Sequence, residues 1–538
     1  MIEFDHASFT YRAQGDEGRA GAVDVSLTAH PGEVVVLCGR SGCGKSTVLR
    51  LAGGLAPRFF PGTAHGRVSL DGRAVDALET WEIAQRAGSL FQNPRTQFFS
   101  ADSTGEVAFA LENAGWSPED IRQRVGATFE ELGMSALAGR DLFRLSGGER
   151  QKVAFASLWA TRPANLLLDE PTSNLDLPAV ADMAGFVARA KEAGCAVLVA
   201  EHRLSWLTGI ADRYVRMEAG RVDRVWGADE FAALSAEEVR RMGLRMRSAD
   251  EARPVVRPPV REAPNVGQPT LGVPGGGAAP AGDGGPAGAA APARRAGPRC
   301  AARSAGASAP LLSARGLAVR FGERTVLRGA DVDLREGEVC AVVGANGAGK
   351  TTLCRALCGF ERRARGTVSL AGRTASRSAR VRASSMVFQD VNYQLFAESV
   401  ADEVVFGLPR RQARAVDVAA LLVGLDLDGL EERHPATLSG GQKQRLAVAA
   451  CVAAHKQVLV FDEPTSGLDL DGMRRVARLL RELAAQGRTV LVITHDLELV
   501  ACACDRALVV EGGRVGATML VADHFDAVKR AMGVSREH

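Results

Sequence analysis

The amino-acid sequence carries the same ordered set of landmarks twice, once before residue 240 and once after residue 310. Each set contains a short apolar run, a glycine-rich turn, a second apolar run that ends in two acidic residues, and a third apolar run. A repeat of this length indicates a duplicated folding unit. At 538 residues the chain is also too long for one ordinary domain. We therefore expect two copies of one domain, at residues 1–240 and 311–538.

The apolar runs predict the fold class. They lie at residues 34–38, 166–168 and 196–200 in the first copy, and at residues 339–343, 458–461 and 490–493 in the second. Short, continuous apolar runs are typical of parallel strands buried on both faces. Helical patterns follow them, so strands and helices alternate along the chain. The sequence thus predicts an α/β fold with a parallel-sheet core in each copy.

The segment between the copies has a different composition. From about residue 253 to residue 310 it is mostly Pro, Gly and Ala, with few large apolar side chains. Such a segment cannot bury enough surface to offset its ordering entropy. We expect a flexible, disordered linker over residues 241–310. The part rich in Pro, Gly and Ala, about 58 residues long, would span about 40 to 45 Å as a random coil, which lets the two domains pair with each other.

Charge and hydropathy exclude some classes of protein. The 66 Lys and Arg residues nearly balance the 63 Asp and Glu residues, so no general positive field favours nucleic acid as a partner. The sequence has no uninterrupted apolar run of about 18 residues and no signal-peptide pattern at its start. We expect no nucleic acid partner and a location in the cytosol.

Two glycine-rich turns match the phosphate-loop pattern G-x-x-x-x-G-K-[ST]. They are Gly39-Arg40-Ser41-Gly42-Cys43-Gly44-Lys45-Ser46 and Gly344-Ala345-Asn346-Gly347-Ala348-Gly349-Lys350-Thr351. Backbone amides at such a turn can wrap phosphate groups. The lysine should reach the β and γ phosphates of ATP, and the following Ser46 or Thr351 hydroxyl should bind Mg²⁺. Thr47 and Thr352 complete the nucleotide-binding set expected here.

Paired acids end a later apolar run in each copy: Asp169 and Glu170 in the first, Asp462 and Glu463 in the second. The first acid of each pair should bind Mg²⁺ through water. The second should orient or deprotonate the attacking water, a task worth about 10² to 10⁴ in rate. Two such pairs, each placed after a phosphate loop, predict two sites of ATP hydrolysis.

A third motif precedes each acidic pair. It reads Leu145-Ser146-Gly147-Gly148-Glu149 in the first copy and Leu438-Ser439-Gly440-Gly441-Gln442 in the second. It resembles the signature motif of ABC ATPases, whose domains add a helical subdomain to the parallel-sheet core. The resemblance implies that each ATP lies between the two domains. One site would join Lys45 and its acids to Ser439 and Gly441, and the other would join Lys350 and its acids to Ser146 and Gly148.

The resemblance assigns further residues to the two sites. Gln92 and Gln389 match the Q-loop glutamine, which contacts nucleotide and metal; Asp176 and Asp469 match the D-loop; and His202 and His495 match the catalytic histidine that senses the γ-phosphate. Tyr11 and Phe321 resemble the aromatic residue that stacks on adenine. An exposed ring with no ligand is the alternative interpretation of these two residues.

The sequence around the Q-loop indicates which group of ABC ATPases the chain resembles. In each copy a second glutamine, Gln97 or Gln394, follows the Q-loop glutamine by five residues, and a Glu-Val-x-Phe stretch comes next. This pattern resembles the energy-coupling factor ATPases, which power uptake of vitamins and transition-metal ions. The resemblance implies a transmembrane coupling subunit and a small substrate-binding membrane subunit as partners, and a peripheral location at the cytoplasmic face of the membrane. The alternatives are a tandem ATPase of another importer class and a soluble translation-factor ABC ATPase.

The two copies also differ at positions that should lie in the sites. Glu149, Asn174 and Arg203 in the first copy correspond to Gln442, Gly467 and Asp496 in the second. The differences allow unequal turnover at the two sites, and neutral drift after the duplication is the alternative explanation.

Overall fold

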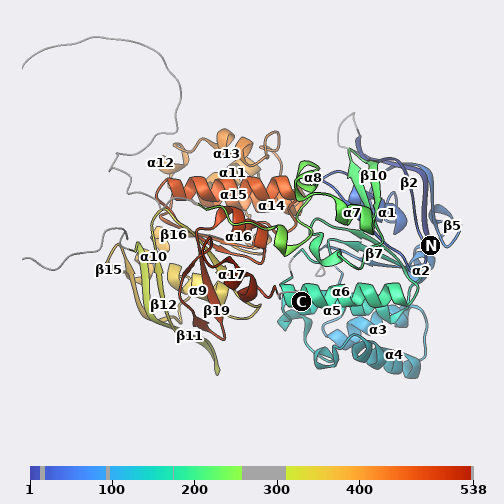
Figure 1. The fold of residues 1–538 in the computed structure, drawn as a ribbon, viewed down its shortest axis with the longest axis horizontal. Coiled ribbons are helices and arrows are strands. Elements are labelled where there is room, and N and C mark those ends of the chain that lie inside the picture. The colour runs from blue at the N-terminus through green and yellow to red at the C-terminus, as the bar shows by residue number, and fades with distance from the viewer. Residues whose placement is uncertain (13–17, 93–96, 174, 257–309, 535–538) are drawn as a thin grey trace, which may run out of the picture.

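A computed structural model describes residues 1–12, 18–92, 97–173, 175–256 and 310–534. These residues form two halves of the same architecture, which lie side by side (Figure 1). The segment 257–309, which makes up most of the expected linker, lies outside the described residues. The α/β fold predicted from the sequence is confirmed in both halves.

Each half is built on a mainly parallel sheet. In the first half the strand order is β10-β9-β3-β8-β7-β6, and in the second it is β16-β17-β18-β13-β19-β20, with β21 beside β19. The first sheet comprises β3 (Val34–Cys38), β6 (Ala87–Leu90), β7 (Asn165–Asp169), β8 (Ala196–Ala200), β9 (Arg213–Glu218) and β10 (Arg221–Gly227). The second comprises β13 (Val339–Val343), β16 (Ser384–Val387), β17 (Val458–Asp462), β18 (Thr489–Ile493), β19 (Arg506–Glu511), β20 (Arg514–Val515) and β21 (Met519–Leu520). All six apolar runs identified in the sequence are strands of these sheets.

A second, antiparallel sheet in each half was not predicted from the sequence. Its order is β2-β1-β4-β5 in the first half and β12-β11-β14-β15 in the second. These strands are β1 (Ile2–Tyr11), β2 (Arg19–Ala29), β4 (Gly62–Leu70) and β5 (Arg73–Ala74), then β11 (Leu312–Phe321), β12 (Arg324–Leu334), β14 (Arg365–Leu370) and β15 (Arg373–Thr374). One face packs on the core and the other is exposed, so the apolar residues alternate with polar ones and no continuous apolar run appears.

The parallel sheet lies between two hydrophobic cores because successive side chains of a strand point to opposite faces. In β3, Val34 and Val36 belong to the core that contains the longer helices, whereas Val35 and Leu37 belong to the core beneath the antiparallel sheet. Strand β13 divides its side chains in the same way. Every side chain of both strands is therefore buried, which explains their unbroken apolar sequences.

The helices cover the sheets and form a helical region in each half. In the first half they are α1 (Lys45–Ala52), α2 (Thr80–Arg86), α3 (Ser103–Asn113), α4 (Pro118–Glu131), α5 (Gly147–Ala160), α6 (Leu177–Glu192), α7 (Ala228–Ala233) and α8 (Ala236–Arg241). In the second they are α9 (Lys350–Cys358), α10 (Arg377–Ala383), α11 (Val400–Val405), α12 (Arg410–Ala413), α13 (Val418–Gly424), α14 (Gly440–Ala453), α15 (Leu470–Ala485), α16 (Leu497–Ala503) and α17 (Phe525–Ala531). Helices α3 and α4 lie at one end of the molecule and α11 to α13 at the opposite end, so the halves are arranged head to tail (Figure 1). No helix in the described ranges is long and apolar enough to cross a membrane.

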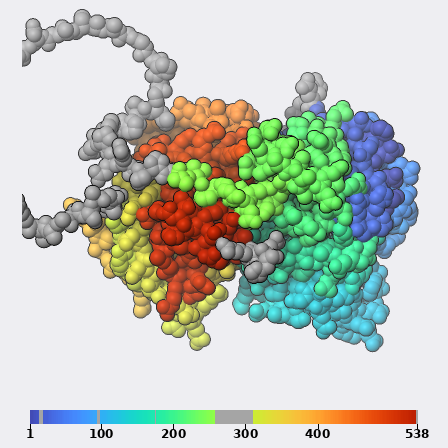
Figure 2. Space-filling view, in the orientation of Figure 1, coloured from blue at the N-terminus to red at the C-terminus, as the bar shows by residue number. Residues whose placement is uncertain are grey.

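The expected start of the linker, residue 241, is wrong. Residues 244–256, which we call the strap, continue beyond α8 and pass from the first half onto the second (Figure 2). Ala252 is buried in the core of the second half, and the amide of Val255 donates to the carbonyl oxygen of Ala501 at 3.0 Å. The composition of this stretch resembles that of a linker. The contacts could not be predicted from it, because Arg245 and Val255 form hydrogen bonds with residues more than 200 positions away.

Candidate active sites

Each phosphate loop joins the first strand of the parallel core to the helix that follows it, β3 to α1 and β13 to α9. The first glycines of the loops, Gly39 and Gly344, have φ values of 140° and 141°. A Cβ atom at Gly39 would lie 2.4 Å from the carbonyl oxygen of Met217, and one at Gly344 would lie 2.1 Å from that of Val510. Only glycine fits here, because the loop backbone passes directly against the neighbouring strand.

The loop lysines are buried within their own loops. The ammonium group of Lys45 donates to the carbonyl oxygens of Gly39 and Arg40 at 3.0 and 3.1 Å. Lys350 makes the same two bonds in its loop, at 2.7 and 3.0 Å. Each lysine stands at the first turn of a helix, whose free amides also favour an anion. Both loops can therefore offer a phosphate group a cation and backbone donors together.

A hydroxyl and a carboxylate meet beside each lysine. Ser46 Oγ donates to Asp169 Oδ1 at 2.9 Å, and Thr351 Oγ1 donates to Asp462 Oδ2 at 2.8 Å. Burial raises the pKa of Asp169 and raises that of Asp462 to about 6, although the adjacent hydroxyl and lysine in each half oppose the shift. Within the described ranges no three His, Cys, Asp or Glu side chains form a metal-binding group. This donor set fits Mg²⁺ that takes its remaining ligands from nucleotide and water.

The second acids, Glu170 and Glu463, directly follow β7 and β17. Both have left-handed backbone conformations, with φ values of 46° and 51°, a strained geometry for a residue other than glycine. Burial, with help from the nearby Glu201 and Asp169 carboxylates, raises the pKa of Glu170 to about 8. Burial raises the pKa of Glu463 to about 7, although the guanidinium group of Arg203 opposes the shift. Carboxyl groups with pKa values near neutrality are suited to general-base chemistry.

These pKa values predict how stability depends on pH in chelator-treated, nucleotide-free protein. Above about pH 5 an unfolded chain, with pKa values near 4.5, has released both protons, whereas the folded protein retains one on Glu463 up to about pH 7 and one on Glu170 up to about pH 8. The free energy of unfolding should therefore fall as pH rises, by at most about 1.4 kcal/mol per unit and per group. Urea unfolding at several pH values should give a flatter curve for the Glu170→Gln, Glu463→Gln double variant. Parallel curves for the parent and the variant would contradict the assignment.

A histidine lies between the lysine and the glutamate in each half. His202 Nε2 is 3.3 Å from Lys45 Nζ and 3.5 Å from Glu170 Oε1. His495 stands in the same relation to the lysine and glutamate of its own half, at 3.1 and 3.8 Å. Burial and the adjacent lysine hold the pKa of His202 well below its ordinary value and lower that of His495 to about 3. Both imidazoles are therefore neutral at pH 7.

The Q-loop glutamines differ between the halves. Gln92 Nε2 donates to Glu170 Oε2 at 2.7 Å. Gln389 is exposed, and Glu463 instead accepts from the hydroxyl of Thr494 and the amide of His495, both at 3.4 Å. Among the described contacts, a hydrogen bond therefore links Gln92 to Glu170, whereas the partners of Glu463 are Thr494 and His495.

The signature motifs begin helices. Ser146 and Ser439 are the N-caps of α5 and α14, and each forms a reciprocal pair with the third helical residue, Glu149 or Gln442. The glycines that follow allow close packing: a Cβ at Gly148 would lie 3.8 Å from the Leu175 side chain, and one at Gly441 would lie 3.3 Å from Leu468. Gly147 and Gly440 are the first residues of these helices. Each signature motif therefore packs against the residue just before the D-loop aspartate of its own half.

The D-loop aspartates join the two halves. Asp469 Oδ2 accepts a hydrogen bond from the amide of Ser41 at 2.7 Å, and Asp176 Oδ2 accepts one from the amide of Asn346 at 2.9 Å. Each aspartate also uses its other oxygen to cap the helix that follows it, α15 or α6. The phosphate loop of each half is thus bound by the D-loop of the other half.

The structure describes a further D-loop contact at the site headed by Lys45. A Cβ at Gly467 would lie 2.8 Å from Gln92 Nε2 and 3.2 Å from Glu170 Oε2, so the D-loop backbone of the second half packs on Glu170 of the first. Nearby, the Ser466 hydroxyl donates to the carbonyl oxygen of Ser173. Asn174, the residue of the first half that corresponds to Gly467, lies outside the described residues.

The expected adenine-stacking residues occupy similar places with different partners. The Tyr11 hydroxyl lies 3.0 Å from Thr47 Oγ1 and accepts from Arg50 at 2.9 Å, so the ring stands against α1. Phe321 lies under the guanidinium group of Arg363, 5.1 Å from its ring centroid. Contact of either ring with adenine stays a prediction.

The other residues predicted to bind nucleotide lie in the two loops or in the first turn of α1 and α9. They are Gly42, Cys43, Gly44, Ala345, Gly347, Ala348, Gly349 and Thr352.

Sequence reasoning missed two groups that brace these sites. Buried Glu201 accepts from the hydroxyl of Thr172 and, at 2.7 Å, from the amide of His202. Buried Arg245 reaches the second half from the strap. Glu201 had a signal, its position one residue before His202. Arg245 had none, because its carboxylate partners are brought to it only by the pairing of the halves.

Comparison with known proteins agrees with this geometry. The family model described as ABC transporter matches residues 22–173 and 327–466. A Treponema denticola protein named "Putative ABC transporter ATP-binding protein" is 38% identical over 515 residues, which cover 96% of each chain. A Streptomyces coelicolor protein of the same description is 35% identical, over 97% of this chain and 94% of its own length.

Solved structures show the same two-domain fold at lower identity. An archaeal ribosome recycling factor, aABCE1, solved with the ribosomal stalk protein aP1, has a TM-score of 0.59 and 21% identity, over 97% of this chain and 92% of that one. A chain from a model of ribosome-bound archaeal Pelota and ABCE1 has a TM-score of 0.62 and 20% identity, over 97% of this chain and 80% of that one. At this identity the likeness concerns the fold alone. On the family match and the two full-length relatives, the chain belongs to the ABC transporter ATP-binding family and carries two of its ATPase domains in one polypeptide.

Proposed function

We propose that the protein is the ATP-hydrolysing subunit of an energy-coupling factor type importer, attached to the cytoplasmic face of the membrane. Its cargo would be a vitamin or a transition-metal ion, selected by a separate membrane subunit. The observation that carries the membrane partner is a pair of exposed aromatic residues beside the Q-loop, present at the same place in both halves. The contacts of the D-loops across the two halves support the ATPase part of the proposal.

In the proposed reaction, ATP draws the halves together at two composite sites. Lys45 and Lys350 hold the β and γ phosphates, and the signature serines, Ser439 and Ser146, cap the γ-phosphate from the opposite half. The catalytic acid of each half accepts a proton from the attacking water. His202 and His495, which are neutral, can donate a hydrogen bond to the γ-phosphate through the nitrogen that carries the proton.

Mg²⁺ would be held at the hydroxyl and carboxylate pairs, Ser46 with Asp169 and Thr351 with Asp462. When bound, the ion neutralises phosphate charge and the charge of buried carboxylates. Gln92 lies on the catalytic acid and is placed to sense the same region. Its motion on nucleotide binding would be passed along the Q-loop to the protein surface.

The aromatic residues at that surface are Phe99 and Phe396, which are 74% and 65% exposed. Phe99 stacks on Phe109 at a centroid distance of 4.7 Å, and Phe396 lies 6.2 Å from Phe406. Large exposed aromatic residues mark interaction sites on soluble proteins, because leaving them in water is unfavourable. Their recurrence in both halves fits a partner that binds the two domains in the same way.

The residues of the energy-coupling factor resemblance hold these aromatic residues in place. In the first half Gln97 accepts from the amide of Phe91 at 3.0 Å, and Glu106 accepts from the amides of Phe99 and Ser100, both at 2.9 Å. In the second half Gln394 and Glu403 make the matching bonds. The second glutamine and the glutamate of Glu-Val-x-Phe therefore fix the loop that joins the Q-loop to the exposed ring.

Affinity purification from detergent-solubilised membranes tests this proposal. The tagged protein should co-purify with apolar membrane polypeptides, and a Phe99→Ser, Phe396→Ser double variant should lose them. The matched control is Trp81→Ser, which removes a ring that is 63% exposed but lies on α2, away from the Q-loop; it should keep the partners. Co-sedimentation with ribosomes in place of membrane polypeptides would overturn the importer assignment. Capture of membrane subunits of another importer class would overturn only the energy-coupling factor type.

A further inference from the structure

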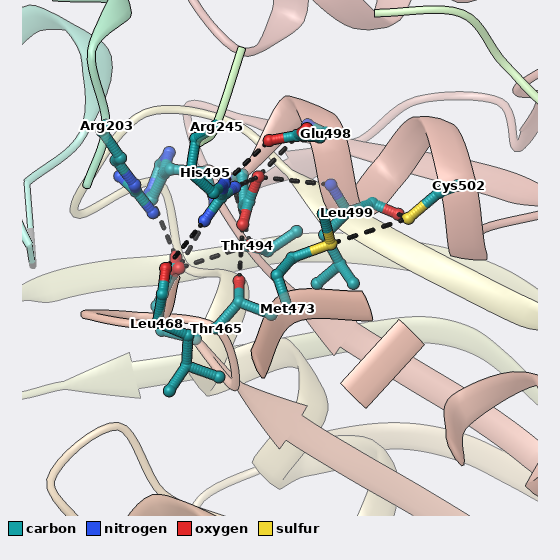
Figure 3. Close-up of polar contacts among 12 residues, drawn as sticks. Arg203, Arg245, Thr465, Leu468, Met473, Thr494, His495, Glu498, Leu499 and Cys502 are labelled. Carbon is teal, nitrogen blue, oxygen red and sulfur yellow. Dashed lines mark hydrogen bonds and ion pairs between the residues drawn. The ribbon is translucent and has the colours of Figure 1, made fainter. Parts of the chain in front are cut away.

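The strap, residues 244–256, carries one buried charge from the first half into the second. Arg245 is 4% exposed. Its guanidinium group donates to Asp496 Oδ1 at 2.6 Å and to Glu498 Oε2 at 2.7 Å, which are both in the second half (Figure 3). It also donates to the carbonyl oxygen of Leu468 at 3.2 Å. One side chain of the first half thus ties together two separate segments of the second half.

Both of these segments belong to the ATP sites. Asp496 directly follows His495, and its carboxylate also accepts from the Thr465 hydroxyl at 2.7 Å and from the first amides of α16. Leu468 directly precedes Asp469, which binds the phosphate loop of the first half. Fixing Asp496 therefore fixes the backbone from which the His495 imidazole projects.

The first half supports its own histidine with a different set of partners. Its residue at the position of Asp496 is Arg203, and the carboxylate comes instead from Glu201. Glu201 is bound by the hydroxyl of Thr172, by the amide of His202 at 2.7 Å and by the indole nitrogen of Trp206 at 3.1 Å. All of these partners lie in the first half. The two histidine loops, segments 201–207 and 494–500, therefore have different supports. The first is held by residues of its own half, and the second is held by Arg245 of the other half.

Electrostatics make Arg245 necessary to this arrangement. Burial works to raise the pKa of Asp496, but the Arg245 and Arg203 guanidinium groups outweigh it and lower that pKa to about 2. A buried carboxylate that loses its hydrogen-bonded cation is left uncompensated, which is strongly unfavourable. Without Arg245 the Asp496 side chain should turn toward solvent, and the His495 loop should move with it.

We propose that Arg245 is a positioning residue that acts across the interface. It supports the histidine segment of the site headed by Lys350 directly, and it reaches the site headed by Lys45 only through the D-loop backbone at Leu468. The kinetic part of this inference rests on the proposed ATP hydrolysis at two sites. The structural part, tested by hydrogen exchange, does not. The strap is therefore more than a tether between the domains: it makes the two sites unequal by construction.

Amide hydrogen exchange on the nucleotide-free full chain tests the structural part. Arg245→Ala should speed exchange at least tenfold in segments 465–470 and 494–500, and leave segment 201–207 of the first half unchanged. The control is Arg247→Ala: Arg247 binds Glu251 within the strap and the carbonyl oxygen of Leu234 in the first half, so its loss should leave segment 494–500 protected. Unchanged exchange in segment 494–500 of the Arg245 variant, or equal acceleration in both histidine loops, would overturn the inference.

Steady-state kinetics test the functional part in two backgrounds, each with one catalytic acid removed. In the Glu170→Gln background, Arg245→Ala should lower kcat for the remaining site at least tenfold with KM for ATP changed less than about twofold. Arg245→Lys keeps the positive charge but cannot make all the hydrogen bonds of the planar guanidinium group, so its kcat should be intermediate. In the Glu463→Gln background, Arg245→Ala should lower kcat by a clearly smaller factor, because His202 keeps its own support from Glu201. Equal losses in the two backgrounds would overturn the inference, whereas loss of membrane partners would bear only on the importer proposal.

Discussion

Changing both Glu170 and Glu463 to Gln is expected to lower the rate of ATP hydrolysis by about 10² to 10⁴, the contribution typical of a general base. Glutamine has nearly the same shape and still offers one oxygen, so the hydrogen bond from Gln92 can persist. It cannot accept a proton from water at neutral pH. Phosphate release should therefore fall while the dissociation constant for ATP, measured by equilibrium dialysis with Mg²⁺, changes only a few-fold.

The control for this variant is Glu130→Gln, which alters an exposed glutamate of α4 and should leave the rate unchanged. A double variant that hydrolyses ATP at the parent rate would refute the assignment of Glu170 and Glu463. Loss of ATP binding together with the rate would point to a structural role, because the acids would then be needed to hold the phosphate loops.

The sequence predicts the parallel sheets better than any other part of the fold. Strands such as β3 and β13 are buried on both faces, so every side chain is apolar and the pattern is unambiguous. Strands such as β1 and β11 bury alternate residues and include polar ones at exposed positions. Their pairing depends on contacts between residues far apart in the chain, which a short sequence window does not contain.

For the candidate sites, the residues within one loop were predictable and the contacts between halves were only partly so. Lys45 and Ser46 lie in one motif, so the spacing of the motif sets their geometry. Asp469 could be assigned to a D-loop, but its bond to the Ser41 amide depends on how the halves pair. Arg245 lies in a stretch that resembles a linker by composition, and only the paired structure reveals its buried carboxylate partners.

A second large effect is expected from Asp176→Asn combined with Asp469→Asn. Burial works to raise the pKa of Asp469, but hydrogen bonds from the amides of Ser41 and Gly472 outweigh it and keep the pKa below its ordinary value. Both carboxylate oxygens are therefore used, one in each half of the molecule. Asn has one acceptor oxygen, so its NH₂ group must face a backbone amide, and one of the two bonds is lost.

Hydrogen bonds to charged groups contribute about 1.5 to 3 kcal/mol, so each substitution should weaken the pairing of the halves by about 10- to 100-fold. The two sites are equivalent in this contact, so kcat/KM for ATP should fall about tenfold or more in each single variant and about 10²-fold or more in the double variant.

Asp471→Asn is the matched control: Asp471 also lies at the interface, 3.3 Å from Arg40, but Arg40 is largely exposed, and pairs of this kind contribute little. Its kcat/KM should stay within twofold of the parent value. If the D-loop double variant matched that control, the halves would have to close through other contacts, and the bonds from Ser41 and Asn346 to the opposite aspartates would be a consequence of pairing rather than a cause of it.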